Sequence, residues 1–162
     1  MKQITIIRHA RTEFFSSSGL DFDRRLTTDG IRTATENAWK LAAVLPDPPD
    51  LILASSAART VRTAEIFAEI LKYPQEDIIT DLHLYHAGGR ELLMELQNMA
   101  PGFKNILLIG HNPAISELAA MIAPENRMIF SPADWISLHL DTDDWHDLGT
   151  VHPALTGKVS AG

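Results

Sequence analysis

Residues 4–12 read ITIIRHART, and the first half of this stretch decides the fold class. Its first four residues, ITII, are all β-branched and three of them are apolar, which predicts a short buried strand. Charged and polar side chains follow at once, beginning with Arg8 and His9. The same order recurs twice, because LILA at residues 51–54 precedes SSAART and ILLI at residues 106–109 precedes GHNP. The sequence therefore predicts buried strands that end in chemically active side chains.

The segments between these strands have the apolar spacing of helices. We expect a first helix that Thr28 or Asp29 caps and that runs to about Leu45, with Ile31, Ala34, Ala38, Leu41, Ala42 and Leu45 on its inward face. Further helices are expected over about residues 58–71, 90–99 and 113–123. Ile78 and Ile79 suggest a third strand, and Ile136 to Leu140 alternate as an edge or half-exposed strand would.

Strands and helices alternate along most of the chain, which favours one α/β domain with a largely parallel sheet covered on both faces. We therefore predict a three-layer α/β/α sandwich. Residues 1–150 are expected to form a single catalytic domain. Residues 151–162 are small and polar, and they are expected to form a flexible C-terminal tail.

The composition limits the classes of function. The 162 residues are 45% hydrophobic and 22% charged, as in ordinary globular proteins. The formal net charge of −7 disfavours nucleic-acid binding but permits a small anion in a local basic pocket. No cysteine is present, which excludes thiolate catalysis and cysteine-ligated metals. No apolar stretch approaches a membrane span, and the N-terminus does not resemble a signal peptide, so a cytoplasmic location is expected.

The residues that follow the three strands are expected to meet at one edge of the sheet, because ligands of open α/β sheets bind beyond the carboxyl ends of the strands. Together they bring two imidazoles and at least two guanidinium groups. Arginine matches phosphate oxygens with a rigid fork, and neutral histidine offers a nucleophilic nitrogen. The pattern therefore predicts a phosphoryl pocket with a histidine nucleophile.

The three motifs also carry a resemblance. RHA at residues 8–10, SSAARTVRTA at residues 55–64 and GHNP at residues 110–113 resemble, in this order, the motifs of the histidine phosphatase superfamily, the phosphoglycerate-mutase-like group. The similarity spans roughly residues 1–140. DRRLTTDG at residues 23–30 and the LYHAGGRELLMEL stretch are similar to the branch of SixA-like phosphohistidine phosphatases.

The resemblance implies a role for each matching residue. His9 would attack phosphorus and become phosphohistidine, while Arg8, Arg59 and His111 would hold the phosphoryl oxygens. Arg24 and Asn112 would add contacts to the substrate. No metal or other cofactor is implied. The implied partner is a phosphorylated protein or a small phosphorylated substrate, with no nucleic acid and no membrane. The sequence does not indicate an oligomeric state.

The chain departs from the family pattern at the proton donor. Many members carry an acid after the third strand, where this chain has His83 or Leu84. Asp81, His83 and His86 are the candidate substitutes, and of these Asp81 and His83 are taken as the possible proton donors. Because a P–N bond is labile and its imidazole leaving group can already be protonated, the departure favours protein phosphohistidine as substrate over alkyl phosphomonoesters.

Other interpretations stay open. A broad phosphatase for small phosphomonoesters or nucleotides is the alternative within enzymes, and a non-catalytic phosphate-binding module is the alternative from another class. Taken singly, Arg8 and His9 could be a solvated strand end, and His111 could be a buried structural histidine. Their combination with the other motifs favours the catalytic interpretation. Arg11 and Arg62 are expected to be surface charges.

Overall fold

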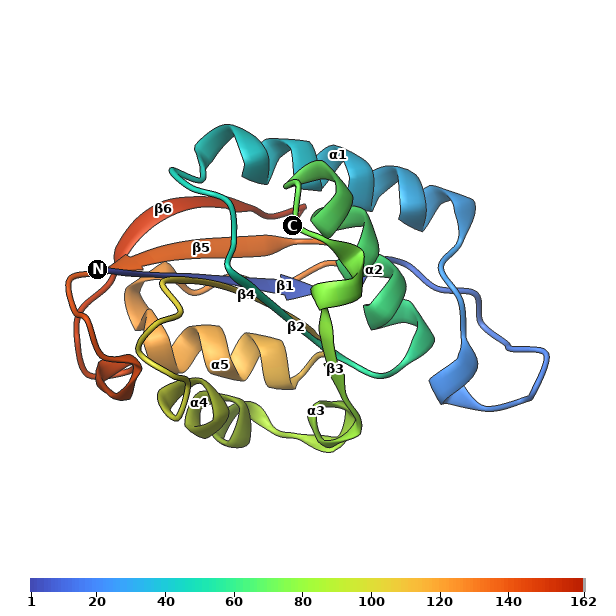
Figure 1. Ribbon diagram of the computed structural model, residues 1–162. Coiled ribbons are helices and arrows are strands. Elements are labelled where there is room, and N and C mark those ends of the chain that lie inside the picture. Colours follow the sequence, from blue (N-terminus) through green and yellow to red (C-terminus); the bar gives the residue numbers. More distant parts are fainter. Residues whose placement is uncertain (162) are drawn as a thin grey trace.

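The apolar runs of the sequence form the inner strands of a mixed sheet. The computed structural model describes residues 1–161, and these form six strands between two layers of helices (Figure 1). The strands are β1 (Lys2–Arg8), β2 (Leu51–Ser55), β3 (Ile79–Asp81), β4 (Asn105–Gly110), β5 (Trp135–Leu140) and β6 (Ala154–Val159). The helices are α1 (Thr28–Val44), α2 (Ala58–Ile70), α3 (Leu82–His86), α4 (Gly89–Gln97) and α5 (Ala114–Ile122). Short 3-10 turns are η1 (Asp21–Asp23), η2 (Gln75–Asp77), η3 (Pro124–Asn126) and η4 (Trp145–Asp147).

The strand order places the three motif-bearing strands side by side. Across the sheet the order is β3-β2-β4-β1-β5-β6. The first four of these strands run parallel to one another, whereas β5 and β6 are antiparallel to their neighbours. Strands β1, β2 and β4 consequently end at the same edge. The predicted α/β/α sandwich with a largely parallel sheet is confirmed.

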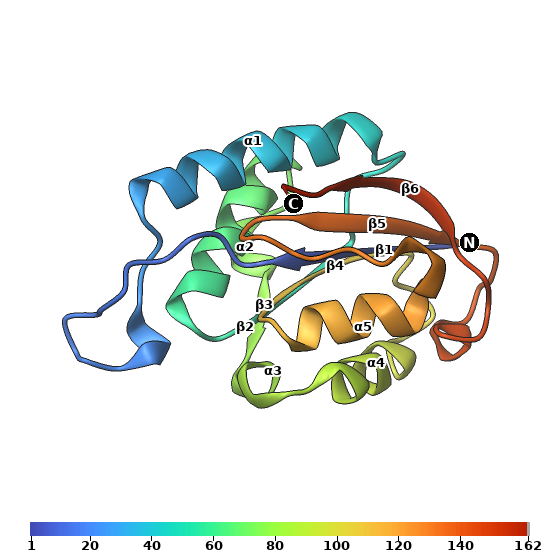
Figure 2. The ribbon, with the colours of Figure 1, turned by 180° about the vertical axis from the view of Figure 1, so that it is seen from behind.

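Each face of the sheet is covered by its own helices. Helices α1 and α2 lie over one face, and α3, α4 and α5 lie over the other (Figures 1 and 2). The inward face of α1 buries Ala34, Ala38 and Leu41, at the spacing of one helical stripe. Thr27 caps this helix, one residue before the predicted Thr28, because its Oγ1 accepts a hydrogen bond from the Gly30 amide at 2.9 Å. No helix within residues 1–161 is long and apolar enough to span a membrane.

The C-terminal segment was expected to form a flexible tail over residues 151–162, of which residue 162 lies outside the described residues. The described part, residues 151–161, differs from this expectation. Residues 154–159 form β6, which pairs antiparallel with β5. Because β6 occupies the outer position, β5 lies inside the sheet and is almost entirely buried, so it is not the edge strand expected from its alternating pattern. The segment ALTGKV joins the sheet through main-chain hydrogen bonds, which do not require an apolar run.

The start of α1 packs against the chain that leaves β1, and this contact requires a glycine. A Cβ atom added to Gly30 would lie 2.3 Å from the carbonyl oxygen of Arg11. The same carbonyl accepts a hydrogen bond from the Thr27 amide at 3.0 Å. The contact therefore fixes where α1 begins relative to the residues that follow β1.

We expect Gly30→Ala to lower the free energy of unfolding by about 1–3 kcal/mol, since the added methyl group overlaps a backbone carbonyl that cannot move independently. Urea denaturation measures the change. Gly102→Ala is the matched control, because no atom lies within 4 Å of a Cβ built at Gly102. Equal stability of the two variants would contradict this view of the contact.

Candidate active site

Strand pairing brings the first and third motifs together. Arg8 and Gly110, the last residues of β1 and β4, are direct partners in the parallel register. The His9 amide continues this pairing by donating to the Gly110 carbonyl at 3.0 Å. His9 and His111 therefore leave neighbouring strands at the same level, and their ring centroids are 5.3 Å apart. The second motif joins them from β2, with Arg59 in the first turn of α2.

The residues predicted for the site line a single cavity of about 320 Å³. Its lining contains all six residues predicted to hold or attack the phosphoryl group, namely Arg8, His9, Arg24, Arg59, His111 and Asn112. Arg11, Thr12, Phe14 and Pro132 complete the lining. A larger hollow of about 760 Å³ lies over α5 and residues 127–129, but it contains none of the predicted site residues. The arrangement of reactive groups therefore identifies the smaller cavity as the candidate active site.

Hydrogen bonding sets the protonation of His9. Its Nδ1 lies 2.8 Å from the Ala10 carbonyl oxygen. Because a carbonyl oxygen only accepts, Nδ1 carries the proton and the neutral ring keeps its lone pair on Nε2. Thr63 holds this turn by accepting from the Ala10 amide and donating to the Arg59 carbonyl. Nε2 is thus left as the nucleophilic nitrogen.

Burial keeps both histidines neutral. It lowers the pKa of His9 to about 3, and the hydrogen bond to Ala10 only partly opposes this effect, while the neighbouring His111, Arg59 and Arg8 reinforce it. Burial also lowers the pKa of His111 to about 4, with a further contribution from Arg59. His111 Nε2 lies 2.7 Å from the Ser55 hydroxyl. Both rings are therefore uncharged at neutral pH.

Asp21 organises the arginines. Its Oδ1 accepts from Arg24 Nε at 2.9 Å, and its Oδ2 accepts from Arg59 Nη2 at 2.9 Å. The Tyr85 hydroxyl donates to the same Oδ2 at 2.6 Å. The hydrogen bond from Tyr85, followed by those from Arg59 and Arg24, holds the Asp21 pKa well below its usual range. Asp21 therefore stays ionised and fixes both guanidinium groups.

Sequence reasoning missed Asp21 and Tyr85. Asp21 precedes Arg24 by three residues, a spacing at which side chains can meet across one turn, and this spacing was the available signal. Tyr85 stood in the LYHAGG stretch without an assigned role. Its contact with Asp21 joins residues 64 positions apart, so no local pattern indicates it. Tyr85 also packs edge-on against the His111 ring, with centroids 5.3 Å apart.

The site holds buried nitrogens that no protein atom satisfies. Within residues 1–161, four buried side-chain atoms have no hydrogen-bond partner, and three of them are Arg8 Nε, Arg59 Nε and His111 Nδ1. A buried polar group without a partner costs about 1–3 kcal/mol. Three of the four belong to residues that line this cavity, whose charged side chains are all arginines. The arrangement fits an anion whose oxygens accept from these nitrogens.

The candidate proton donors Asp81 and His83 do not lie in the cavity. Asp81 accepts a hydrogen bond from the His83 amide at 2.8 Å and so caps α3. His83 is exposed and its Nε2 lies 3.8 Å from Glu95. Neither residue is among those that line the cavity with His9. The structure therefore assigns both side chains to local contacts around α3.

Metal binding is not indicated by the described part of the chain. Residues 1–161 contain no group of three or more histidine, cysteine, aspartate or glutamate side chains that could hold a metal ion.

Positive charge in the cavity comes from guanidinium groups. Burial lowers the pKa of Arg8 from its ordinary value, and the nearby Asp134 opposes this shift. Arg8 Nη1 donates to the Phe130 carbonyl at 2.8 Å, which fixes the side chain.

The family follows from comparison of the sequence with known families. The model of the histidine phosphatase superfamily (branch 1) matches residues 4–90, which is more than half of the chain. The chain belongs to the histidine phosphatase superfamily, so the resemblance seen in its motifs is confirmed. The matched region includes His9, Arg24 and Arg59, whereas His111 lies beyond it. No curated protein matches the sequence.

Three solved structures share the fold of this chain. A protein assigned as the phosphohistidine phosphatase SixA of Nakamurella multipartitia superposes with a TM-score of 0.80 at 24% identity, over 98% of this chain and 95% of that one. The corresponding assigned protein of Agrobacterium tumefaciens gives 0.78 at 25% identity, over 98% of both chains. The protein histidine phosphatase SixA complexed with tungstate gives 0.78 at 22% identity, over 98% and 96%.

The depressed histidine pKa values predict a flat titration. As the pH falls from 7.5 to 5, the rings of His9 and His111 should stay neutral, because their pKa values lie near 3 and 4 and not near 6.5. Ring resonances followed by NMR test this, with His9→Ala and His111→Ala identifying the two signals. A midpoint near 6.5 for either ring would contradict the proposed burial effect.

Proposed function

We propose that the protein is a phosphatase that forms a covalent phosphohistidine on His9 and that its substrate is phosphohistidine on another protein. The observation that carries this proposal is the cavity itself: a neutral histidine with a free Nε2 lies among arginines whose buried nitrogens lack acceptors. Membership of the histidine phosphatase superfamily supports the same chemistry.

In the first step, His9 Nε2 attacks phosphorus and the bond between phosphorus and the leaving nitrogen breaks. Arg8, Arg59 and His111 bind the phosphoryl oxygens, where their charge and hydrogen bonds stabilise the transition state. The Ser55 hydroxyl oxygen accepts from the Ala57 amide at 3.3 Å, so we take its own proton to be donated to Nε2 of His111. The proton of that ring is then on Nδ1 and can be donated to a phosphoryl oxygen. Arg24 and Asn112 add contacts from the rim.

In the second step, water attacks phosphorus of the phosphohistidine, the bond to Nε2 breaks and inorganic phosphate leaves. The hydrogen bond from Nδ1 to the Ala10 carbonyl keeps the ring in place through both steps. Because the leaving group of this step is a ring of low proton affinity, its departure does not depend on a strong acid. His9 returns to the neutral form in which it began.

The choice of substrate class rests on the proton donor. Among the described residues that line the cavity, no side chain is a carboxylic acid. Asp21 lies beside the arginines, but they hold it ionised. An alkoxide leaving group would need a proton at this point, whereas the imidazole of phosphohistidine can leave already protonated. The cavity therefore favours a P–N bond over an alkyl phosphomonoester.

Replacing the nucleophile tests the proposal. We expect His9→Ala to lower phosphate release from a histidine-phosphorylated protein by about 1,000-fold or more, since the change removes the nitrogen proposed to accept the phosphoryl group. Phosphorus NMR should show an enzyme-bound phosphohistidine in the wild type alone. His146→Ala, a change at an exposed histidine of η4, is the control and should leave the rate unchanged.

Undiminished turnover by His9→Ala would reject the covalent mechanism. The same assay with p-nitrophenyl phosphate and a nucleoside monophosphate separates the substrate classes. We expect kcat/KM to be higher for the phosphohistidine protein, and the reverse order would replace it with the phosphomonoester alternative. Tight binding of the phosphoprotein by the wild type without phosphate release would instead indicate a binding module.

A further inference from the structure

Two adjacent aromatic side chains project into solvent beside the active site. Phe14 is 89% exposed and Phe15 is 87% exposed, the largest fractions among the large hydrophobic side chains that the structure describes. Leu20, which is 60% exposed, lies on the same segment. This segment, which we call the docking loop (residues 12–20), extends away from the sheet where β1 ends (Figure 1). A paired exposure of this kind is typical of a contact surface.

The exposure is built into an ordered loop. Thr12 and Leu26 form a bridge at its base, where the Glu13 amide also donates to the Arg25 carbonyl at 2.8 Å. At the far end, Ser16 Oγ donates to the Leu20 carbonyl at 2.7 Å and Ser18 Oγ donates to Asp23 Oδ2 at 2.6 Å. The backbone is thus held in a shape that keeps both rings outside the protein core. Such preorganisation lowers the entropy cost of binding.

The docking loop is continuous with the catalytic cavity. Phe14 lines the cavity together with His9, whereas Phe15 is not among the lining residues. Arg24 Nη1 donates to Thr12 Oγ1 at 2.7 Å and to the Glu13 carbonyl at 3.1 Å. The base of the loop is therefore attached to an arginine of the phosphoryl site. Only a substrate that extends beyond the cavity can contact both rings.

We propose that the docking loop selects a phosphoprotein that carries an apolar patch beside its phosphorylated residue, with Phe14 and Phe15 packing on that patch. The inference rests on the proposed function. His9 is buried, so a phosphorylated side chain must enter the cavity and bring its own protein surface against the rim. The arginines of the cavity complement the charge of the phosphoryl group. The exposed rings of the adjoining loop offer apolar area to the protein surface around that group.

The test compares two substrates for each enzyme variant. One is free phosphohistidine, and the other is a designed helical protein with a single histidine in an apolar patch, phosphorylated with phosphoramidate. For the double variant Phe14→Ser/Phe15→Ser we expect KM for the protein to rise about tenfold or more, as for the loss of aromatic anchors at an interface. For Phe15→Ser alone, the kcat/KM for free phosphohistidine should stay within about twofold of the wild type, since Phe15 lies outside the cavity that this substrate occupies.

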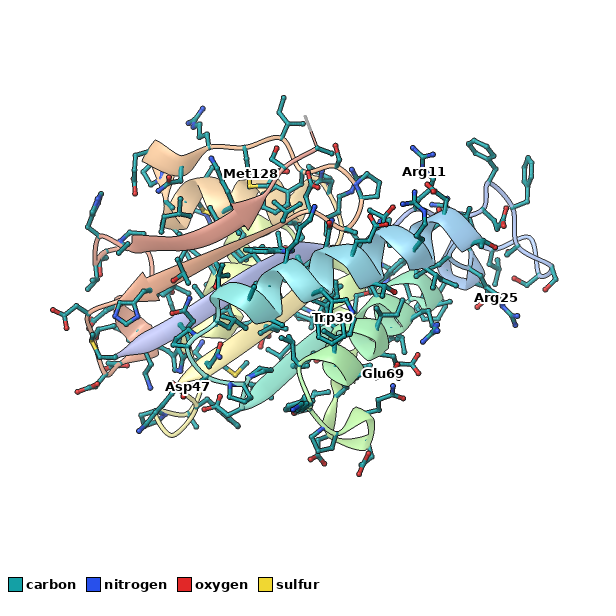
Figure 3. All side chains as sticks on the ribbon, turned by 90° about the horizontal axis from the view of Figure 1, so that it is seen from above. Arg11, Arg25, Trp39, Asp47, Glu69 and Met128 are labelled. Carbon is teal, nitrogen blue, oxygen red and sulfur yellow. The ribbon has the colours of Figure 1, made fainter. Side chains whose placement is uncertain are left out.

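Trp39→Ser is the matched control. Trp39 is 61% exposed and lies midway along α1, away from the end of the molecule marked by Arg11 and Arg25 (Figure 3). Replacing Trp39 should change neither KM nor kcat/KM for either substrate. Phe15→Ser alone should reproduce part of the rise in KM, because this ring lies outside the cavity. A version of the designed protein with serines in place of its apolar patch should be insensitive to the double variant.

Distinct results separate the two proposals. A wild type that hydrolyses neither substrate contradicts the proposed function. If the wild type hydrolyses both and the double variant is unchanged on the protein, the docking proposal is wrong. An equal loss on both substrates in Phe15→Ser also overturns it, because this ring would then act on the cavity and not on the surface of the substrate protein. Two further results would overturn the docking proposal by assigning the rings to another contact. One is self-association of the wild type in size-exclusion chromatography that is lost only in the double variant. The other is binding of the wild type to phosphatidylglycerol vesicles that is lost only in the double variant.

Discussion

The parallel pairing of β1 and β2 with β4 is the constraint on which the site depends. The register that pairs Arg8 with Gly110 sets His9 beside His111, and the pairing of β2 with β4 brings Ser55 to the same edge. Each reactive side chain is then fixed by a contact that its neighbours supply, as when Ser55 lies within hydrogen-bond distance of His111. A shift of one residue in the register of β1 with β4, or of β2 with β4, would turn these side chains to the opposite face of the sheet. The cavity would then not form.

The cavity concentrates positive charge in a protein whose formal net charge is −7. Arg59 is buried, and a buried guanidinium requires a partner. Asp21 supplies one and also binds Arg24, so a single carboxylate orders two arginines. The ion pair with Asp21 leaves Arg59 Nε without an acceptor, and Arg8 Nε and His111 Nδ1 also have none. These unsatisfied atoms lower the stability of the folded protein at the positions that a phosphoryl group would bind. Such a trade-off between folding stability and function is common at active sites.

Local patterns predicted most of the fold, because the apolar runs and the helical spacing are continuous in the sequence. The bounds of α1, α2 and α4 fall within about two residues of expectation, as assignment at helix ends allows. Strand β6 escaped prediction because ALTGKV has no apolar run and is held by main-chain pairing to β5. The motifs were enough to predict six of the residues that line the candidate cavity. Asp21 and Tyr85 could not be predicted, since their roles arise from contacts between distant segments.

A crystal structure with bound tungstate would show whether the cavity binds a phosphoryl group as proposed, because this oxyanion resembles that group. We expect tungsten in line with Nε2 of His9 and oxygens within hydrogen-bond distance of Arg8 Nε, Arg59 Nε and His111 Nδ1, the three buried nitrogens of the cavity without a protein acceptor. Asp21 should remain on Arg24. An anion bound elsewhere, or bound in the cavity without contact to these nitrogens, would contradict the account.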